Sequence, residues 1–178
     1  LCSNLTLSTT YPVFENFDSG SLGWTATSLD TVTKWQLGYP NFAAFVGAYS
    51  GNSCWDVNLT SNYGTSAQAY LYSPVYTSAT PFTQLKFKLR YEVEANYDGM
   101  HVEYTNDNGL TWNILGTNND PNGVNWYNTT SVVSFSAACW TGYSNAWLSA
   151  EYNLANYGFV GNLQFRFVMH SDNFINYN

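Results

Sequence analysis

Oxygen-bearing side chains suited to a hard metal cation gather in three loop segments of the sequence. They are Glu15, Asn16 and Asp18 near the start, Asn96 and Asp98 in the middle, and Asp172 near the end. Calcium takes its ligands from the oxygens of Asp, Glu and Asn in loops of this kind. The same residue types favour turns, so a bound cation and plain turn formation are the two alternatives at each segment.

A second group of acids raises hydrolysis as a candidate chemistry. A glycosidase needs two positioned carboxylates, and Glu92, Glu94 and Glu103 are predicted to share one face of a sheet. These acids, however, belong to a face that also carries basic residues, which is typical of a solvated surface. His101 and His170 are solitary and lack the spacing of metal ligands or of a nucleophile with its base. The sequence therefore favours a domain that is not an enzyme.

An Asp-box pattern, Ser/Thr-x-Asp-x-Gly-x-Thr-Trp, is matched at every defined position by Thr105-Asn106-Asp107-Asn108-Gly109-Leu110-Thr111-Trp112. In such a turn we expect Asp107 to accept hydrogen bonds from turn amides and Gly109 to adopt a positive φ. The ring of Trp112 is expected to be largely buried beneath the turn. Sialidase propellers repeat this motif, but the sequence has one copy. We therefore predict a structural role for Thr105, Asp107, Gly109 and Trp112.

The chain has three cysteines, Cys2, Cys54 and Cys139, so at least one of them has no partner within it. Cys54 and Cys139 each precede a tryptophan, and we predict a disulfide between these two. The alternative is a pair of buried free thiols, which are common in protein cores. The partner of Cys2 stays open.

Charged residues are scarce, at 10% of the chain, and 12 acids against 5 Lys and Arg leave a net charge of −7. Binding to nucleic acid needs clustered cations, and the chain offers only Lys86, Lys88 and Arg90, so we expect no such partner. No apolar run approaches the roughly 20 residues of a spanning helix, so no membrane insertion is expected. The composition, low in Lys and rich in Asn, Thr and Tyr, indicates a secreted or cell-surface protein.

Alternation of apolar and charged residues predicts strands. In residues 85–94 the apolar members Leu85, Phe87, Leu89, Tyr91 and Val93 are expected to point inward together. Residues 100–104 alternate in the same way, and turn residues 96–99 between the two runs predict a hairpin. Further strands are expected at residues 35–37, 54–59, 69–73, 112–115, 132–135, 147–152 and 163–169. The spacing predicts one all-β domain over residues 1–178, a two-sheet antiparallel jelly-roll sandwich.

A series of short motifs, spread over nearly the whole chain, resembles a known family. In order they are Phe14-Glu15-Asn16-Phe17-Asp18, Gly23-Trp24, Trp35-Gln36-Leu37-Gly38, Trp55-Asp56-Val57-Asn58-Leu59-Thr60-Ser61-Asn62-Tyr63, Tyr70-Leu71-Tyr72-Ser73-Pro74, Leu85-Lys86-Phe87, Tyr97-Asp98-Gly99, the Asp-box, Asn125-Trp126-Tyr127-Asn128, Trp140-Thr141-Gly142, Phe165-Arg166-Phe167 and Ser171-Asp172. The order resembles the MAM-like jelly-roll modules of large secreted Bacteroidetes proteins, related to those flanking immune-inhibitor-A-type metallopeptidases.

The resemblance implies a two-sheet jelly roll, often bound to calcium, in surface adhesins or exported enzymes that leave the cell by type IX secretion. In the family a Glu-Gly turn and a last strand ending in paired acids follow the Ser-Asp segment. This chain instead ends at Asn178, so we expect a fragment whose last strand lies outside it. Because a jelly roll commonly pairs its first and last strands, we predict one calcium ion held by Glu15 or Asp18, with Asp98 or Asp172 as further donors.

These observations favour a non-catalytic extracellular adhesion or ligand-binding module of a bacterial cell-surface protein. Exposed Tyr and Trp beside Asn-rich loops suit sugar rings, so carbohydrate binding is part of this hypothesis. The expected partners are a glycan or a surface-protein ligand and other domains of the same large protein. The alternatives are an accessory domain of a secreted hydrolase, either a metallopeptidase or a glycosidase, and a structural spacer in a surface filament.

Overall fold

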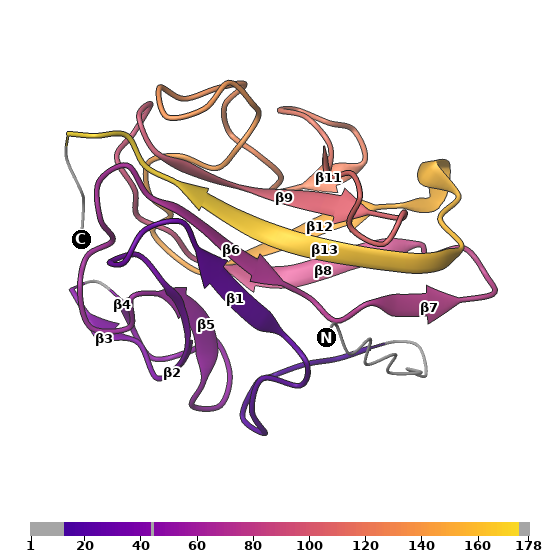
Figure 1. Ribbon diagram of the computed structural model, residues 1–178, viewed down its shortest axis with the longest axis horizontal. Helices are drawn as coiled ribbons and strands as arrows, with labels where there is room; N and C mark the ends of the chain where they lie inside the picture. The colour runs from indigo at the N-terminus through magenta and orange to yellow at the C-terminus, as the bar shows by residue number, and fades with distance from the viewer. Residues whose placement is uncertain (1–12, 44, 175–178) are drawn as a thin grey trace.

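The computed structural model describes residues 13–43 and 45–174, and they form antiparallel β-sheets (Figure 1). The largest sheet has the strand order β1 (Thr25–Ser28), β6 (Gln68–Tyr72), β13 (Gly161–His170), β9 (Gly99–Thr105) and β10 (Asn113–Ile114), and β7 (Tyr76–Ser78) pairs with the start of β13. A second sheet has the order β11 (Gly123–Val124), β12 (Leu148–Asn153) and β8 (Gln84–Leu89). Two small sheets pair β2 (Trp35–Gly38) with β5 (Cys54–Val57) and β3 (Asn41–Phe42) with β4 (Phe45–Val46).

The predicted all-β, antiparallel class is confirmed. Within the described ranges, the helical element is a single 3-10 turn, η1 (Ala155–Tyr157), and no helix has the length and apolar character needed to cross a membrane. Each predicted strand overlaps a strand of the structure except residues 132–135, where Val132 and Phe135 form an isolated bridge.

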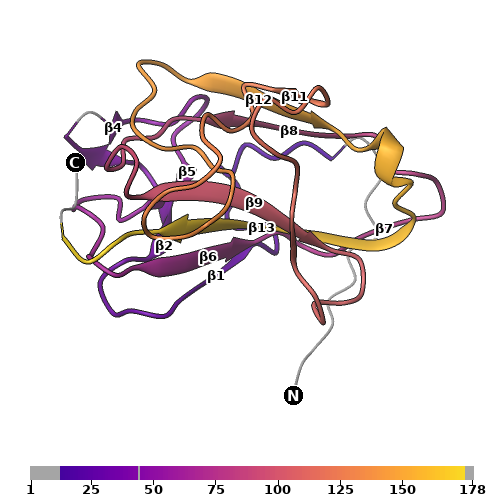
Figure 2. The same cartoon turned by 90° about the horizontal axis from the view of Figure 1, so that it is seen from above.

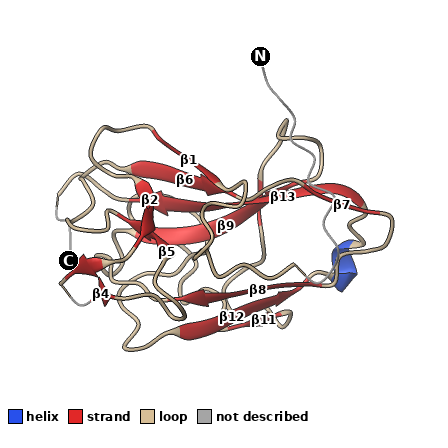
Figure 3. Cartoon of the chain, turned by 90° about the horizontal axis from the view of Figure 1, so that it is seen from below, coloured by secondary structure: helices blue, strands red, loops and turns tan. Residues whose placement is uncertain are grey.

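The six-stranded and three-stranded sheets lie in two layers with the main hydrophobic core between them (Figures 2 and 3). Aromatic rings fill much of this core. The Phe87 ring of β8 lies 4.9 Å from the Phe167 ring of β13 and 5.9 Å from that of Trp140, and Trp126 lies 5.2 Å from Trp140. Edge-to-face contacts of this kind stabilise a core beyond the area that they bury, which gives the high aromatic content a structural role.

The alternation in β8 has the predicted consequence. Leu85, Phe87 and Leu89 pack into the core, whereas Lys86 and Lys88 are exposed. Tyr91 and Val93 are buried as well, although the strand itself ends at Leu89. One face of this run is therefore apolar and buried along its whole length, as its period of two requires.

The predicted hairpin between residues 85–94 and 100–104 is wrong. β8 pairs with β12 in the three-stranded sheet, while β9 pairs with β13 and β10 in the other layer. After Leu89 the chain leaves β8 and bonds to the segment around Gly142, with Val93 N donating to Gly142 O at 2.8 Å. The turn that follows then connects the two layers instead of two neighbouring strands.

Candidate metal centre

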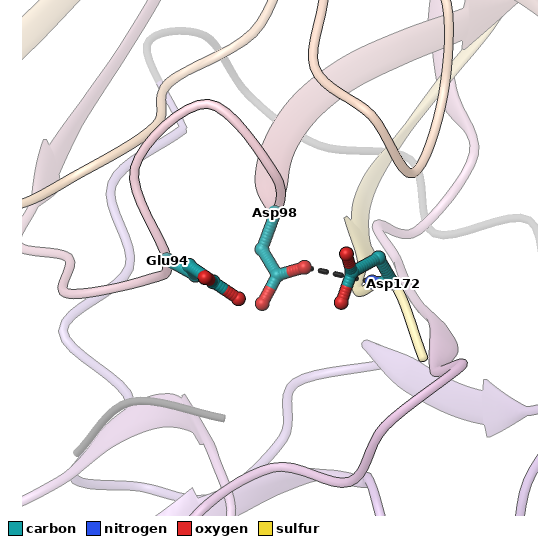
Figure 4. Close-up of side chains that lie close together, drawn as sticks. All are labelled: Glu94, Asp98 and Asp172. Carbon is teal, nitrogen blue, oxygen red and sulfur yellow. Dashed lines mark hydrogen bonds between the residues drawn. The ribbon is translucent and has the colours of Figure 1, made fainter. Parts of the chain in front are cut away.

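Three carboxylates converge where the ends of β9 and β13 meet: those of Glu94, Asp98 and Asp172 (Figure 4). Asp98 directly precedes β9, and Asp172 follows β13 by two residues. The two strands are antiparallel, with Gly99 opposite His170, so the start of one lies beside the end of the other. The sheet register itself therefore places the two aspartates together.

Glu94 reaches the same place through the turn before β9. The amide of Asp98 donates to the Glu94 carbonyl at 2.9 Å, and Asn96 between them has a φ of 70°. The Thr141 hydroxyl stabilises this turn by donating to the carbonyls of Asp98 at 2.7 Å and Glu94 at 3.3 Å. Asn tolerates the left-handed region better than most residues, so this short turn forms without a glycine.

Hydrogen bonds fix the orientation of the Asp98 carboxylate, which is fully buried. Its Oδ1 accepts the amide of Asp172 at 2.7 Å, and its Oδ2 accepts the hydroxyl of Tyr63 at 2.7 Å. The same Tyr63 oxygen accepts the amide of Glu94 at 3.2 Å. Each Asp98 oxygen keeps a second lone pair for a further contact.

The site concentrates negative charge in a buried place. Burial raises the pKa of Asp98 to about 6, and the carboxylates of Asp172 and Glu94 add to that rise. Among the described residues, no ion pair with Lys, Arg or His involves any of the three acids. Like charges this close disfavour one another's ionised form, so a cation would relieve the repulsion.

The donor set fits a metal ion. One ligand atom from each residue lies within 4.8 Å of the others, and two calcium ligands at about 2.3–2.6 Å from one ion lie at most about 5 Å apart. Glu94 Oε2 and Asp172 Oδ2 are buried and have no hydrogen-bond partner in the described part of the chain. Carboxylate oxygens alone suit a hard cation such as calcium or magnesium. The cluster can therefore hold a metal ion.

Of the four acids predicted as ligands, the structure brings only Asp98 and Asp172 together. Asp18 instead caps the loop that follows Tyr49, with its Oδ1 accepting the amides of Asn52 at 2.8 Å and Ser53 at 3.1 Å. Glu15 lies beside Trp24, where burial raises its pKa. The structure does not place Glu15 and Asp18 at this cluster, since β1, which follows them, is separated from β13 by β6 and begins level with Arg166, away from the His170 end of β13.

Glu94, the third acid of the cluster, is not among the predicted ligands, because the alternation of residues 85–94 placed it on a solvated face. The signal that could have found it is its spacing. It stands four residues before Asp98, with Asn96 between them, so the turn chemistry of Asn96 predicts that the chain folds back there.

The Asp-box forms a closed hydrogen-bonded turn after β9. Asp107 Oδ2 accepts the Thr111 hydroxyl at 2.6 Å, and its Oδ1 accepts the Thr111 amide at 2.9 Å and the Thr105 hydroxyl at 2.7 Å. Gly109 has a φ of 86°, a conformation that L side chains rarely adopt. These bonds, those from Thr111 first, lower the pKa of Asp107 to about 2.

Trp112 of the Asp-box is half-buried, not largely buried as expected. Its ring lies against the six-stranded sheet, with its centre 4.3 Å from the Arg166 guanidinium carbon and 5.6 Å from the Tyr72 ring. Arg166 in turn pairs with Glu103 of β9. The motif is therefore attached to the sheet through a cation–π contact, which leaves part of the indole exposed.

The predicted disulfide is not formed, since Cys54 and Cys139, the two cysteines within the described ranges, are both free. Cys54 lies in β5 opposite Gly38, whereas Cys139 is fully buried beside Gly99 at the start of β9. Cys54 thus belongs to a small sheet, whereas Cys139 lies outside the named strands, in an isolated bridge with Thr129. Burial raises the pKa of each thiol to about 12, so both are protonated at neutral pH. Cys2 lies outside the described residues.

No family model, no curated protein and no solved structure matches the chain.

Proposed function

We propose that this chain is a calcium-binding, non-catalytic extracellular module that serves adhesion or ligand binding on a secreted or cell-surface protein. The observation that carries the proposal is the buried trio Glu94, Asp98 and Asp172, with two carboxylate oxygens unpaired among the described residues. Calcium is the ion that we propose because it binds carboxylates in a flexible geometry, and backbone oxygens or water complete its coordination.

The calcium ion would act as a clasp. It would join the segment after β13 to the turn before β9, where the described residues supply negative charge from both sides. Because the unfolded chain does not assemble these three acids, calcium binding adds to the free energy of unfolding. Such a clasp suits a module that works in the calcium-rich exterior of a cell.

The architecture that we propose for the module is a jelly roll of the MAM-like kind. Support comes from the two antiparallel layers around one aromatic core and from the ordered motifs of the sequence. The proposed context is a large Bacteroidetes surface protein exported by type IX secretion, with other domains of that protein and a glycan or surface-protein ligand as partners.

Calorimetric titration of the purified chain with calcium chloride tests the metal. We expect one saturable site per chain, lost in Asp172→Asn because that substitution removes an unpaired, charged ligand oxygen. Asp107→Asn is the matched control, since it removes an aspartate at the other end of β9, and it should bind calcium normally. An absence of binding heat, or binding that survives Asp172→Asn, would refute the site.

A glycan array probed with the chain in calcium tests the adhesion half of the proposal. Retention on defined glycans, without their cleavage, is the expected result. A chain that binds calcium but retains neither glycans nor surface proteins would contradict the ligand-binding function and favour the structural spacer.

A further inference from the structure

A cavity of about 120 Å³ lies between the small sheets and the end of β8. Aromatic rings of Trp35, Phe42, Phe45, Trp55 and Trp147 line it, and its inner wall belongs to the second core cluster, which includes Tyr63, Val93 and Met169. Concave sites with aromatic walls and a few polar groups are typical of small-molecule binding. The volume is smaller than the roughly 150 Å³ that encloses one benzene molecule, but the cavity is partly open to solvent, so a ring can rest on its wall without being enclosed.

Three residues of the lining carry buried polar atoms that lack a hydrogen-bond partner among residues 13–43 and 45–174. They are Trp55 Nε1, Arg90 Nε and Asn62 Oδ1. A buried donor or acceptor without a partner costs free energy, so a group that pairs with it is stabilised in return. The lining thus offers two donors and one acceptor beside its aromatic surfaces, which matches a molecule whose hydroxyls both accept and donate.

The charges of the lining balance. The lining has two basic residues, Lys88 and Arg90, and two acidic ones, Asp56 and Glu92. The cavity therefore has no net charge to attract an ion. The Lys88 ammonium already lies 4.4 Å from the centre of the Tyr49 ring, and the Arg90 guanidinium carbon lies 5.1 Å from that of Phe45. The cations are engaged by aromatic faces, and a neutral occupant fits better than an anion.

We propose that this cavity binds one neutral pyranose ring of a glycan, with the apolar face of the sugar on the aromatic wall and its hydroxyls on Trp55, Arg90 and Asn62. The proposal rests on the proposed ligand-binding function and names its site and its ligand class. Aromatic faces and hydroxyl partners together recognise a sugar ring, whereas either feature alone does not.

The cavity and the metal centre share Tyr63. Its ring lines the cavity, and its hydroxyl donates to Asp98. The two sites are therefore separate but adjacent, and each experiment below is run in calcium and again in chelator. Sugar binding that persists in chelator supports the cavity without the metal, so the two proposals can fail independently.

The test is an NMR titration of the indole N–H signals with methyl glycosides of glucose, mannose and galactose. We expect saturable shifts for at least one glycoside, largest for the indoles of Trp35, Trp55 and Trp147, while Trp112 is unmoved. Cyclohexanol supplies a ring with a single hydroxyl, and methyl glucuronide supplies an anion. Saturation by either of these alone would overturn the proposal, as would no saturation by any neutral glycoside.

Two variants separate binding from folding. Asn62→Ala removes an acceptor that has no partner in the described structure, so the melting temperature should hold while glycoside affinity falls about tenfold, the change expected for one lost hydrogen bond. Trp55→Phe keeps an aromatic ring but loses the donor, with a similar fall. Trp112→Phe, outside the cavity, is the matched control with unchanged affinity. If the glycan array is positive and Asn62→Ala and Trp55→Phe bind normally, the module binds glycans elsewhere and the cavity is not their site.

Discussion

Asp98 comes directly before β9 and Asp107 follows it by two residues, so one strand carries an aspartate at each end. Asp98 is fully buried near two other acids, and its pKa is raised to about 6. Asp107 accepts hydrogen bonds from Thr105 and Thr111, and its pKa is lowered to about 2. The pKa of an aspartate is thus raised at one end of the strand and lowered at the other.

The difference comes from the source of the stabilising partners. Asp107 obtains all of its donors from residues 105–111, so its turn is completed by local sequence. Asp98 obtains two donors from distant segments, Tyr63 and the Asp172 amide, together with the negative charge of its neighbours. Local donors suffice for a structural turn, whereas Asp98, buried beside two other carboxylates, needs a nearby cation to be ionised at low cost.

The largest expected effect is that of calcium on thermal stability. At one hundred times the dissociation constant, binding to the folded state alone adds about 2.7 kcal/mol to the free energy of unfolding. For a chain of this size that corresponds to about 5–10 °C in melting temperature. Scanning calorimetry in calcium and in chelator measures this shift in melting temperature. Equal melting temperatures would show that calcium does not stabilise the folded chain.

A second prediction concerns pH. The folded pKa of Asp98 lies above its ordinary value of 3.8, so between about pH 4 and pH 6 the metal-free folded state binds more protons than the unfolded chain. Its free energy of unfolding therefore receives a contribution from Asp98 that falls as pH rises through this window. Calcium must displace that proton, so its affinity should fall about tenfold for each pH unit below pH 6.

Calorimetric titrations at several pH values between about pH 5 and about pH 7.5 would measure this fall. Asp107, with a pKa of about 2, stays ionised throughout and adds no slope of its own. A calcium affinity that is flat across the range would mean that Asp98 is not a ligand.

At the Asp-box end, Trp112→Ala should lower the free energy of unfolding by about 2 kcal/mol, less than the 3–5 kcal/mol of a fully buried tryptophan. The loss comes from the contacts of the half-buried ring with Arg166 and Tyr72. Denaturant unfolding gives the value, and the calcium-induced rise in stability should be unchanged. A loss of calcium response in this variant would show that the two ends of β9 are not independent.

The smallest effect, and the sharpest contrast, comes from replacing each aspartate by asparagine. In chelator at neutral pH, Asp98→Asn should change the free energy of unfolding by about 1 kcal/mol or less, because the loss of charge repulsion offsets the weaker hydrogen bonds. Its calcium response should vanish. Asp107→Asn should lower the melting temperature in both buffers and keep the calcium response. Identical melting curves of the two variants, in chelator and in calcium, would show that Asp98 and Asp107 do not have different roles.

The sequence predicts what depends on local pattern. The alternation of residues 85–94 correctly predicts the inward face of β8, and the loop positions of Asp98 and Asp172 single out two of the three acids of the cluster. A period of two, however, does not name the neighbouring strand, so the pairing of β8 with β12 was not foreseen. Glu94 was missed for a related reason, since the alternation continues past Leu89 while the strand does not.

The predicted disulfide and the predicted amino-terminal ligands do not match the structure, because both predictions depend on which strands lie side by side. Cys54 and Cys139 share a sequence context, each before a tryptophan, but Cys54 lies in β5 and Cys139 in an isolated bridge with Thr129, and both are free. Asp18 is bonded to the loop at Asn52 and Ser53, and β1, which follows it, begins level with Arg166 of β13, away from Asp172. Local composition does not reveal which strands become neighbours. The meeting of Asp98 and Asp172 follows instead from the antiparallel register of β9 and β13.

Whether Glu94, Asp98 and Asp172 share one calcium ion is decided by a crystal structure of the chain grown in calcium chloride, with anomalous diffraction data. We expect one anomalous peak between the three carboxylates, at about 2.3–2.6 Å from their oxygens, and no peak at Asp107. The opposite result, at millimolar calcium and neutral pH, is density for a water molecule at that position or for carboxyl groups that bond directly to one another. Either would show that the three carboxylates hold no calcium ion.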